Sequence, residues 1–218
     1  MPAYDMVIKV IWERNGRSWW GWRSEWTPAW EHWSADEEPV DNVPDWVDPE
    51  VFDAYKWAHQ HGITTMDTLE LADPDGYVVR WHLAKMVVNF AVNVLWREVP
   101  AIPSECHWND KSSAWESKEI KMYAEQSCAL WVMWIYMEEF LPNKIVDRWE
   151  FGTVLSRLLW WDKYNVTDTN NMRYYEKHLR ALKSEEIMTQ IDNPLSRKEL
   201  RKRVWVMLRR VELEEEDE

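Results

Sequence analysis

Glycine is scarce in this chain of 218 residues, which contains only 5 glycines but 19 tryptophans. Average usage of about 7% would predict roughly 15 glycines at this length. Cysteine is scarce as well, and the two present, Cys106 and Cys128, permit one disulfide but exclude a four-cysteine zinc site. The excess of tryptophan over glycine therefore needs an explanation before a function is assigned.

Long apolar runs are also lacking, and acidic residues outnumber basic ones. No run of about 18 apolar residues occurs, so the sequence predicts no membrane insertion. Lys and Arg number 26 against 39 Asp and Glu, a net charge of −13. This charge argues against nucleic acid as a partner, because phosphate binding needs a basic face. No signal peptide is seen at residues 1–12, so either the chain is not exported or the reading frame begins inside a longer gene.

Motifs for catalysis and cofactor binding are missing too. The sequence has no G-x-S-x-G elbow, phosphate loop or dinucleotide fingerprint, and its carboxylates form no recognisable glycosidase pair. The run Cys106-His107 with Asp110 lacks a second Cys or His cluster at zinc spacing. We therefore expect no enzyme activity, no catalytic residue, no cofactor and no metal.

What the chain does have, from about residue 50 onward, is helical periodicity. Wide apolar faces recur over residues 82–95, 150–159 and 201–211, and helical patterns also cover 50–61, 117–130 and 174–184. No alternating run is long enough to predict a strand. The fold class we expect is all-α.

Both ends of the chain lack this periodicity. Residues 1–49 are interpreted as a disordered N-terminal linker, since Pro, Ser, Asp and Glu interrupt every pattern there despite six Trp between residues 19 and 33. Residues 212–218 form an acidic tail, which we also expect to be disordered.

Parts of the helical region repeat each other. Residues 55–64 align without a gap on 124–133, and 79–86 align on 147–154. A looser third copy contains Glu186-Ile187-Met188, then Asn193-Pro194, and then Arg203. Each copy is a helix, a loop, a turn, an Arg and a second helix, and such a unit needs neighbouring copies to supply its core. We place the copies at 50–105, 106–165 and 166–211.

The middle copy resembles the S-layer homology domain, whose pattern joins an aromatic-x-Asp opening, a Phe-x-Pro turn and a Thr-Arg-Ala-Glu-Phe helix start. The matching residues are Trp108-Asn109-Asp110, Phe140-Leu141-Pro142 and Arg148-Trp149-Glu150-Phe151. The resemblance covers residues 51–211, although the third copy has lost the Arg-Ala-Glu-Phe core. It implies tandem helix-loop-helix repeats in a pseudo-threefold arrangement, in a secreted bacterial protein of the cell wall or cell surface.

The resemblance also implies a carbohydrate-binding site. The family arginine that begins each second helix lines a groove between repeats and holds an anionic cell-wall polysaccharide by charge-assisted hydrogen bonds. The candidate glycan-binding residues are then Arg148, Arg80, Glu150 and, for the third copy, Arg203 or Arg201. The alternative is an arginine that is solvated or pairs with a carboxylate such as Glu150.

The function implied is non-catalytic anchoring of a bacterial surface protein to cell-wall polysaccharide, or assembly into a surface layer with other surface-layer proteins. Two alternatives remain open, a helical protein–protein interaction module and the wall anchor of an enzyme encoded upstream. In an exported domain Cys106 and Cys128 form a disulfide worth roughly 3 kcal/mol, and otherwise they are two unrelated buried thiols.

Several tryptophans stand where glycine is expected. Trp96, Trp131 and the pair Trp160-Trp161 directly follow apolar helices, where the chain commonly takes the left-handed conformation that glycine adopts freely. Gly62 holds the position of Trp131 in the first copy. Our hypothesis is that the gene reads UGA as glycine and is translated here with UGA as tryptophan. The alternative is a genuinely tryptophan-rich or designed chain.

The nucleotide sequence tests this hypothesis directly. We expect UGA codons at Trp19, Trp20, Trp22, Trp96 and Trp131. Trp57, Trp108 and Trp205 stand where an aromatic residue is expected, so their codons should be UGG. UGG codons at the first five positions would contradict the hypothesis.

Overall fold

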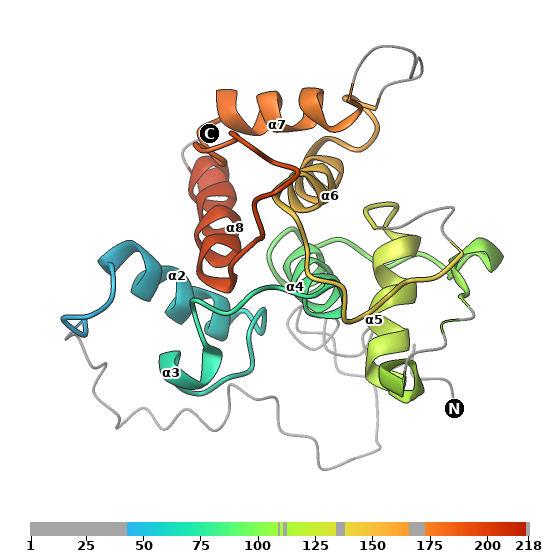
Figure 1. Ribbon diagram of the computed structural model, residues 1–218, viewed down its shortest axis with the longest axis horizontal. Helices are drawn as coiled ribbons and strands as arrows, with labels where there is room; N and C mark the ends of the chain where they lie inside the picture. Colours follow the sequence, from blue (N-terminus) through green and yellow to red (C-terminus); the bar gives the residue numbers. More distant parts are fainter. Residues whose placement is uncertain (1–42, 109, 111–112, 134–137, 166–172, 217–218) are drawn as a thin grey trace, which may run out of the picture. The chain divides into compact units, whose positions relative to one another are not determined.

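The computed structural model describes residues 43–216 except 109, 111–112, 134–137 and 166–172, with side chains described to Leu213. Its α-helices are α2 (Pro49–Gln60), α3 (Leu69–Ala72), α4 (Arg80–Asn93), α5 (Lys118–Ala129), α6 (Arg148–Trp160), α7 (Tyr175–Ser184) and α8 (Arg201–Glu216). Two short 3-10 helices, Ser104–Cys106 and Ser113–Glu116, precede α5. This part of the chain contains no strand, which confirms the all-α fold class (Figure 1).

The six expected helices are all present, and each begins within two residues of its expected start. The four-residue α3 was not expected, because it is too short to show a helical period. The acidic tail differs from expectation, since α8 continues to Glu216. There Val211 is 3% exposed and Arg209 pairs with Glu212 one turn later. The expected linker lies outside the described residues as far as residue 42.

Three short segments join the helices at one place, which we call the hub: residues 77–79, 145–147 and 198–200, just before α4, α6 and α8. Each segment bridges both others, through the pairs Tyr77–Leu200, Val79–Ile145 and Asp147–Lys198. Their middle residues close a ring, in which the N–H of Val78 donates to Glu199, that of Glu199 to Val146, and that of Val146 to Val78, at 3.0, 2.9 and 2.9 Å.

Each hub segment leads directly into a helix whose first residue is arginine. The N–H groups of Arg80, Arg148 and Arg201 donate to the carbonyls of Lys144, Arg197 and Gly76, at 3.0, 2.8 and 3.1 Å. The first N–H groups of a helix have no partner within it, so here the residue just before a neighbouring hub segment accepts from the first of them. The starts of α4, α6 and α8 are thereby held together.

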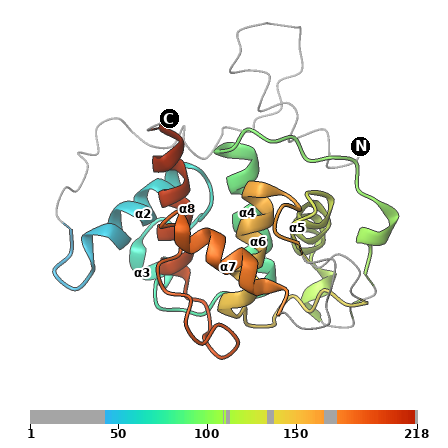
Figure 2. The same cartoon turned by 90° about the horizontal axis from the view of Figure 1, so that it is seen from above.

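The long helices pack in three pairs, α4 with α5, α6 with α7, and α2 with α8. The core between them consists of fully buried apolar side chains, such as Leu83, Phe90, Phe151, Leu155, Trp205 and Leu208. The pair α2–α8 brings the first and last long helices of the described part together, as Figure 2 also shows.

A disulfide fastens the segment between α4 and α5 to α5 itself. The sulfur atoms of Cys106 and Cys128 are 2.09 Å apart, and both residues are buried. Beside it, Trp108 and Trp115 pack on Phe140, with ring centroids 5.3 and 5.8 Å away. Of the two alternatives for the cysteines, the structure contains the disulfide.

Three tryptophans that follow helices have left-handed backbones. Trp96, Trp131 and Trp161 have φ angles of 53°, 59° and 57°, close to the 66° of Gly62. For a residue with a β-carbon this conformation costs roughly 1–2 kcal/mol. Trp96 and Trp161 are 63% and 54% exposed, so burial offsets only part of that cost. These are the backbone conformations that the glycine hypothesis requires.

Replacing Trp96 or Trp161 by glycine should therefore stabilise the protein. We expect each variant to raise the free energy of unfolding by about 1 kcal/mol, because glycine relieves the left-handed backbone. Urea unfolding followed by circular dichroism measures this.

The alanine variants at the same positions are the matched controls, since alanine keeps the β-carbon and should gain nothing. Trp57→Gly should instead destabilise, because Trp57 is 5% exposed within α2. Equal stabilities of the glycine and alanine variants would contradict the explanation.

Candidate functional site

The expected glycan-binding arginines lie at the hub and are buried. Arg80 and Arg148 are each 3% exposed. Arginine is almost never fully buried without a partner. Each of these two guanidinium groups binds a carboxylate that comes from a later part of the chain.

Arg80 binds residues that lie between α5 and the first turn of α6. Its Nη2 donates to Glu150 Oε1 at 2.9 Å, and its Nη1 donates to the Phe140 carbonyl at 3.0 Å. Glu150 also accepts from Lys144 Nζ and from the Asp147 N–H, each at 3.0 Å. Burial alone would raise the pKa of Glu150, but these hydrogen bonds hold it below its ordinary value. Glu150 is therefore ionised, and its oxygen atoms accept hydrogen bonds from other parts of the protein.

Arg148 binds Glu199, just before α8. Its Nε lies 2.8 Å from Glu199 Oε2, and its Nη2 donates to Oε1 at 3.1 Å. Glu199 is completely buried, and that burial raises its pKa to about 7 although the Arg148 guanidinium group acts to lower it. The charge on Glu199 thus depends on Arg148.

Arg201 likewise binds a carboxylate, that of Asp73 at the end of α3. Its Nη1 donates to Asp73 Oδ2 at 2.8 Å and to the Ala72 carbonyl at 3.2 Å. Its backbone hydrogen bond to Gly76 matches those of Arg80 and Arg148, so Arg201, rather than Arg203, holds the third equivalent position. Arg203 lies two residues further along α8 and is partly exposed.

These contacts decide what the sequence-predicted residues do in the fold. Arg80, Arg148 and Glu150 correspond to the alternative in which the arginine pairs with a carboxylate. Their side chains bind other parts of this chain, so a ligand-binding site must be sought elsewhere on the protein.

One groove, of about 280 Å³, lies between α7 and the turn that precedes the third hub segment. Its lining residues are Arg173, Tyr175, Glu176, Leu179, Arg180, Ile191, Asp192, Asn193 and Pro194. Beside it, Trp149 from the start of α6 packs on Tyr174 and Tyr175, with both ring centroid distances 5.7 Å. Tyr174 is 41% exposed, so an aromatic face borders the groove.

The polar groups of this groove are only partly used by the protein. The Tyr175 hydroxyl is buried and has no hydrogen-bond partner among the described residues. Arg180 pairs loosely with Glu176, at 3.6 Å, and its side chain is 71% exposed. Guanidinium groups, carboxylates, an amide and a hydroxyl next to an aromatic face are able to bind a polar ring that carries an acidic group. No motif marks these residues in the sequence, which is why sequence reasoning missed them.

A second groove, of about 460 Å³, lies between α2 and α8. Its charged side chains are already paired, Arg210 with Glu50 and Arg209 with Glu212. Its one aromatic residue, Trp57, is 5% exposed. This groove therefore has fewer unpaired polar groups and less exposed aromatic surface for a ligand than the groove at α7 has.

Two histidines have strongly shifted pKa values for structural reasons. Burial lowers the pKa of both His82 and His178 to about 4. His178 is 1% exposed, and its Nδ1 lies 2.9 Å from the Ser156 hydroxyl. Because both folded-state values lie below the unfolded value near 6.5, their contribution to stability is lost as pH falls from 6.5 toward 4.

Comparison with known proteins assigns no family, since no family model, curated protein or solved structure matches the chain. Within the described ranges, no helix is long and apolar enough to cross a membrane. In the same part of the chain, no group of three or more His, Cys, Asp or Glu side chains is placed to hold a metal ion.

Removing Arg148 should destabilise the whole fold. In Arg148→Ala the completely buried Glu199 loses its partner, and we expect the free energy of unfolding to fall by about 3–5 kcal/mol. The double variant Arg148→Met, Glu199→Leu should recover most of that loss, because no unpaired charge remains. Guanidinium chloride unfolding measures both.

Arg180→Ala is the control, because this exposed arginine should change stability by no more than about 0.5 kcal/mol. A stability for Arg148→Ala equal to that of the control would contradict the assignment of Arg148 to the hub.

Proposed function

We propose that residues 50–211 comprise three degenerate repeats of the S-layer homology type and anchor a bacterial surface protein, without catalysis, to an anionic polysaccharide of the cell wall. The observation that carries the proposal is the hub. Three arginine-led helices make equivalent backbone hydrogen bonds there, to Lys144, Arg197 and Gly76, around a closed ring of three more. A pseudo-threefold arrangement of repeats accounts for both sets of bonds.

Equivalent backbone conformations support the same division into repeats. Gly62, Trp131 and Glu186 follow α2, α5 and α7, and their φ angles are 66°, 59° and 55°. A second set of left-handed residues, Asp73, Leu141 and Asn193, has φ angles of 48°, 55° and 51°, and each of the three is followed by proline. Two such triplets at corresponding positions are what three copies of one unit produce.

The disulfide supports a location outside the cell. Cys106 and Cys128 are joined, and both are 1% exposed. Disulfides form and persist mainly in oxidising compartments such as the cell surface. We accordingly assign the protein to the cell wall.

The groove at α7 is the binding site that we propose for the glycan. An acidic sugar would place its ring against the aromatic face at Tyr174 and its negative charge near Arg173 and Arg180. The net charge of −13 repels an anionic polymer, so binding depends on these local cations. Arg148 acts indirectly in this scheme, as a positioning residue that fixes Trp149 beside the two tyrosines.

Sedimentation with purified cell walls tests the proposal. The double variant Arg173→Ala, Arg180→Ala should retain helicity and lose at least about tenfold in wall affinity, because charge-assisted hydrogen bonds to the glycan are removed. Tyr174→Ala should weaken binding as well, through loss of the aromatic face.

The matched control is Lys118→Ala, Lys163→Ala, which removes two exposed cations outside the groove. It should bind walls as the unaltered chain does. Equal binding by the arginine double variant and this control would contradict the proposed site. Absence of wall binding by the unaltered chain would contradict the anchoring function.

A further inference from the structure

The hub is a positively charged place in an acidic protein. Eight cationic side chains gather around it, namely Arg80, Lys144, Arg148, Arg197, Lys198, Arg201, Lys202 and Arg203. Five carboxylates lie among them, those of Asp73, Asp75, Asp147, Glu150 and Glu199. The local charge is therefore about +3, whereas the whole chain carries −13.

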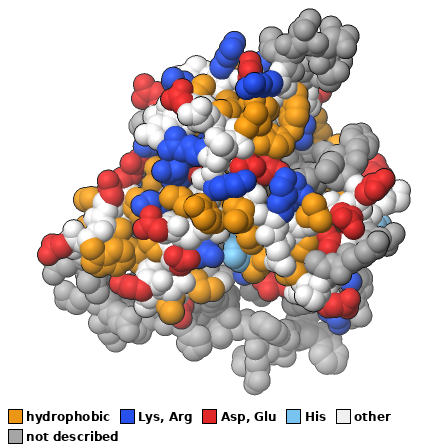
Figure 3. All heavy atoms as spheres, viewed as in Figure 1, with side chains coloured by type: hydrophobic (Ala, Val, Ile, Leu, Met, Phe, Trp, Pro, Cys, Tyr) orange, Lys and Arg blue, Asp and Glu red, His pale blue; other side chains and the backbone are white. Residues whose placement is uncertain are grey.

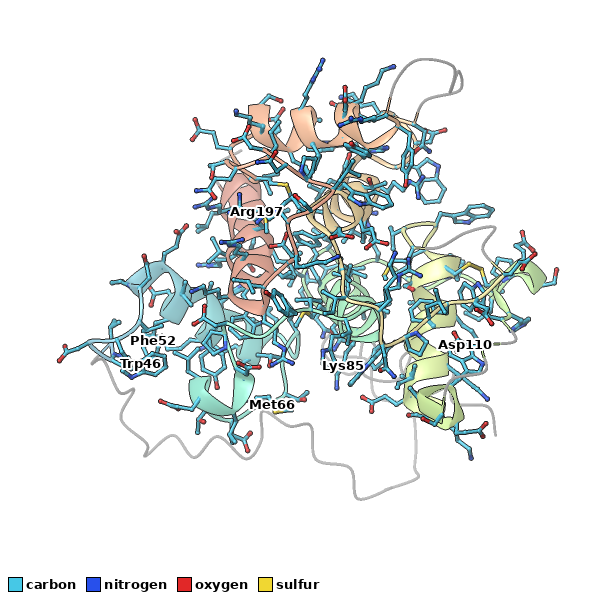
Figure 4. All side chains as sticks on the ribbon, in the orientation of Figure 1. Trp46, Phe52, Met66, Lys85, Asp110 and Arg197 are labelled. Atoms are coloured by element: carbon cyan, nitrogen blue, oxygen red, sulfur yellow. A yellow bond between two sulfur atoms is a disulfide. The ribbon has the colours of Figure 1, made fainter. Side chains whose placement is uncertain are left out.

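In two of the exposed ion pairs at the hub the cation lies nearer to solvent than its carboxylate, whereas Asp73 and Asp75 are more exposed than Arg201 and Lys202. Lys144 and Lys198 have side chains 42% exposed, while their partners Glu150 and Asp147 are 3% and 10% exposed. Figure 3 shows Lys and Arg side chains in the middle of this face, and Figure 4 labels Arg197 there. Arg197 donates to a neutral amide, that of Gln190. Around Lys144, Arg197 and Lys198, solvent therefore meets a basic surface, which we call the hub face.

The helices add to this positive potential. The N-terminal ends of α4, α6 and α8 all lie at the hub, where Arg80, Arg148 and Arg201 begin them. The dipole of a helix places about half a positive charge at its N-terminus. Three long helices thus point their positive ends at one place, and an acidic partner is the kind of group that such a surface binds.

The chain itself contains a segment of that chemistry. Six of the seven residues from 212 to 218 are Asp or Glu. The helix α8 begins at the hub and contains 16 residues, so its last turn lies roughly 24 Å from its own hub face. Figure 2 shows the C-terminal end of α8 at the top of the view, beside the C marker. A continuous helix cannot fold back over that distance, so residues 212–216 do not reach the hub face of their own chain.

We propose that the hub face binds the acidic segment 212–218 of a second copy of this chain, so that copies associate head to tail. The two surfaces are different, so each bound copy still offers one free hub face and one free acidic segment. Such heterologous contacts build rings or open polymers. This contact goes beyond wall anchoring and does not depend on it.

Sedimentation velocity of the unaltered chain tests the contact. We expect association at 50 mM NaCl that weakens at least about tenfold at 500 mM, because exposed charges are screened over a shorter distance. A monomer at both salt concentrations overturns the proposal.

Two complementary variants make the test specific. One neutralises the segment, with Glu214→Gln, Glu215→Gln, Glu216→Gln, Asp217→Asn and Glu218→Gln. The other neutralises the hub face, with Lys144→Gln, Arg197→Gln and Lys198→Gln. Each variant alone should be monomeric, and an equimolar mixture should form dimers of one copy of each and nothing larger. Association of either variant alone as in the unaltered chain overturns the proposal.

Two controls separate this contact from loss of folding and from wall binding. Lys118→Gln, Lys163→Gln, Lys183→Gln removes three exposed cations away from the hub and should associate normally. A synthetic peptide of residues 209–218 should dissociate the unaltered chain into monomers, and failure to do so counts against the contact. The Arg173→Ala, Arg180→Ala variant should still associate, so failure of wall anchoring and failure of this contact give different results.

Discussion

The buried pairing of arginine with glutamate at the hub is the interaction on which the rest of this structure depends. Arg80 with Glu150, and Arg148 with Glu199, join segments that lie 70 and 51 residues apart. Taking such charges out of water costs several kcal/mol for each ion, and this is offset only while both partners are in place. The pairs therefore act chiefly by fixing which segments meet, and the backbone ring of Val78, Val146 and Glu199 forms where they do.

The helices could be predicted from the sequence because their apolar spacing is local. The hub could not, since it consists of three-residue segments whose partners are distant and whose pattern resembles that of a loop. The equivalence of Arg80 and Arg148 was visible, but their burial was not. Glu199 was missed because it precedes its helix, whereas Glu150 lies within one. The groove at α7 was missed because its residues match no motif.

Left-handed backbone positions after helices, which glycine usually occupies, were the other feature that could be predicted from the sequence. The ends of α4, α5 and α6 predicted left-handed residues, and Trp96, Trp131 and Trp161 have that conformation. Trp57, Trp108 and Trp205, where an aromatic residue was expected, are buried. These six tryptophans thus divide by backbone conformation and burial into two groups, which is a physical basis for treating the two groups separately.

The central claim is that the hub holds the helices together as one cooperative unit. Hydrogen exchange of the three ring amides tests this claim most directly. If the hub does so, the N–H groups of Val78, Val146 and Glu199 should exchange only through global unfolding, with the same free energy of opening. Exchange of any one of them at a free energy well below that of global unfolding would contradict the account, because a ring of mutually dependent hydrogen bonds cannot open at one member alone.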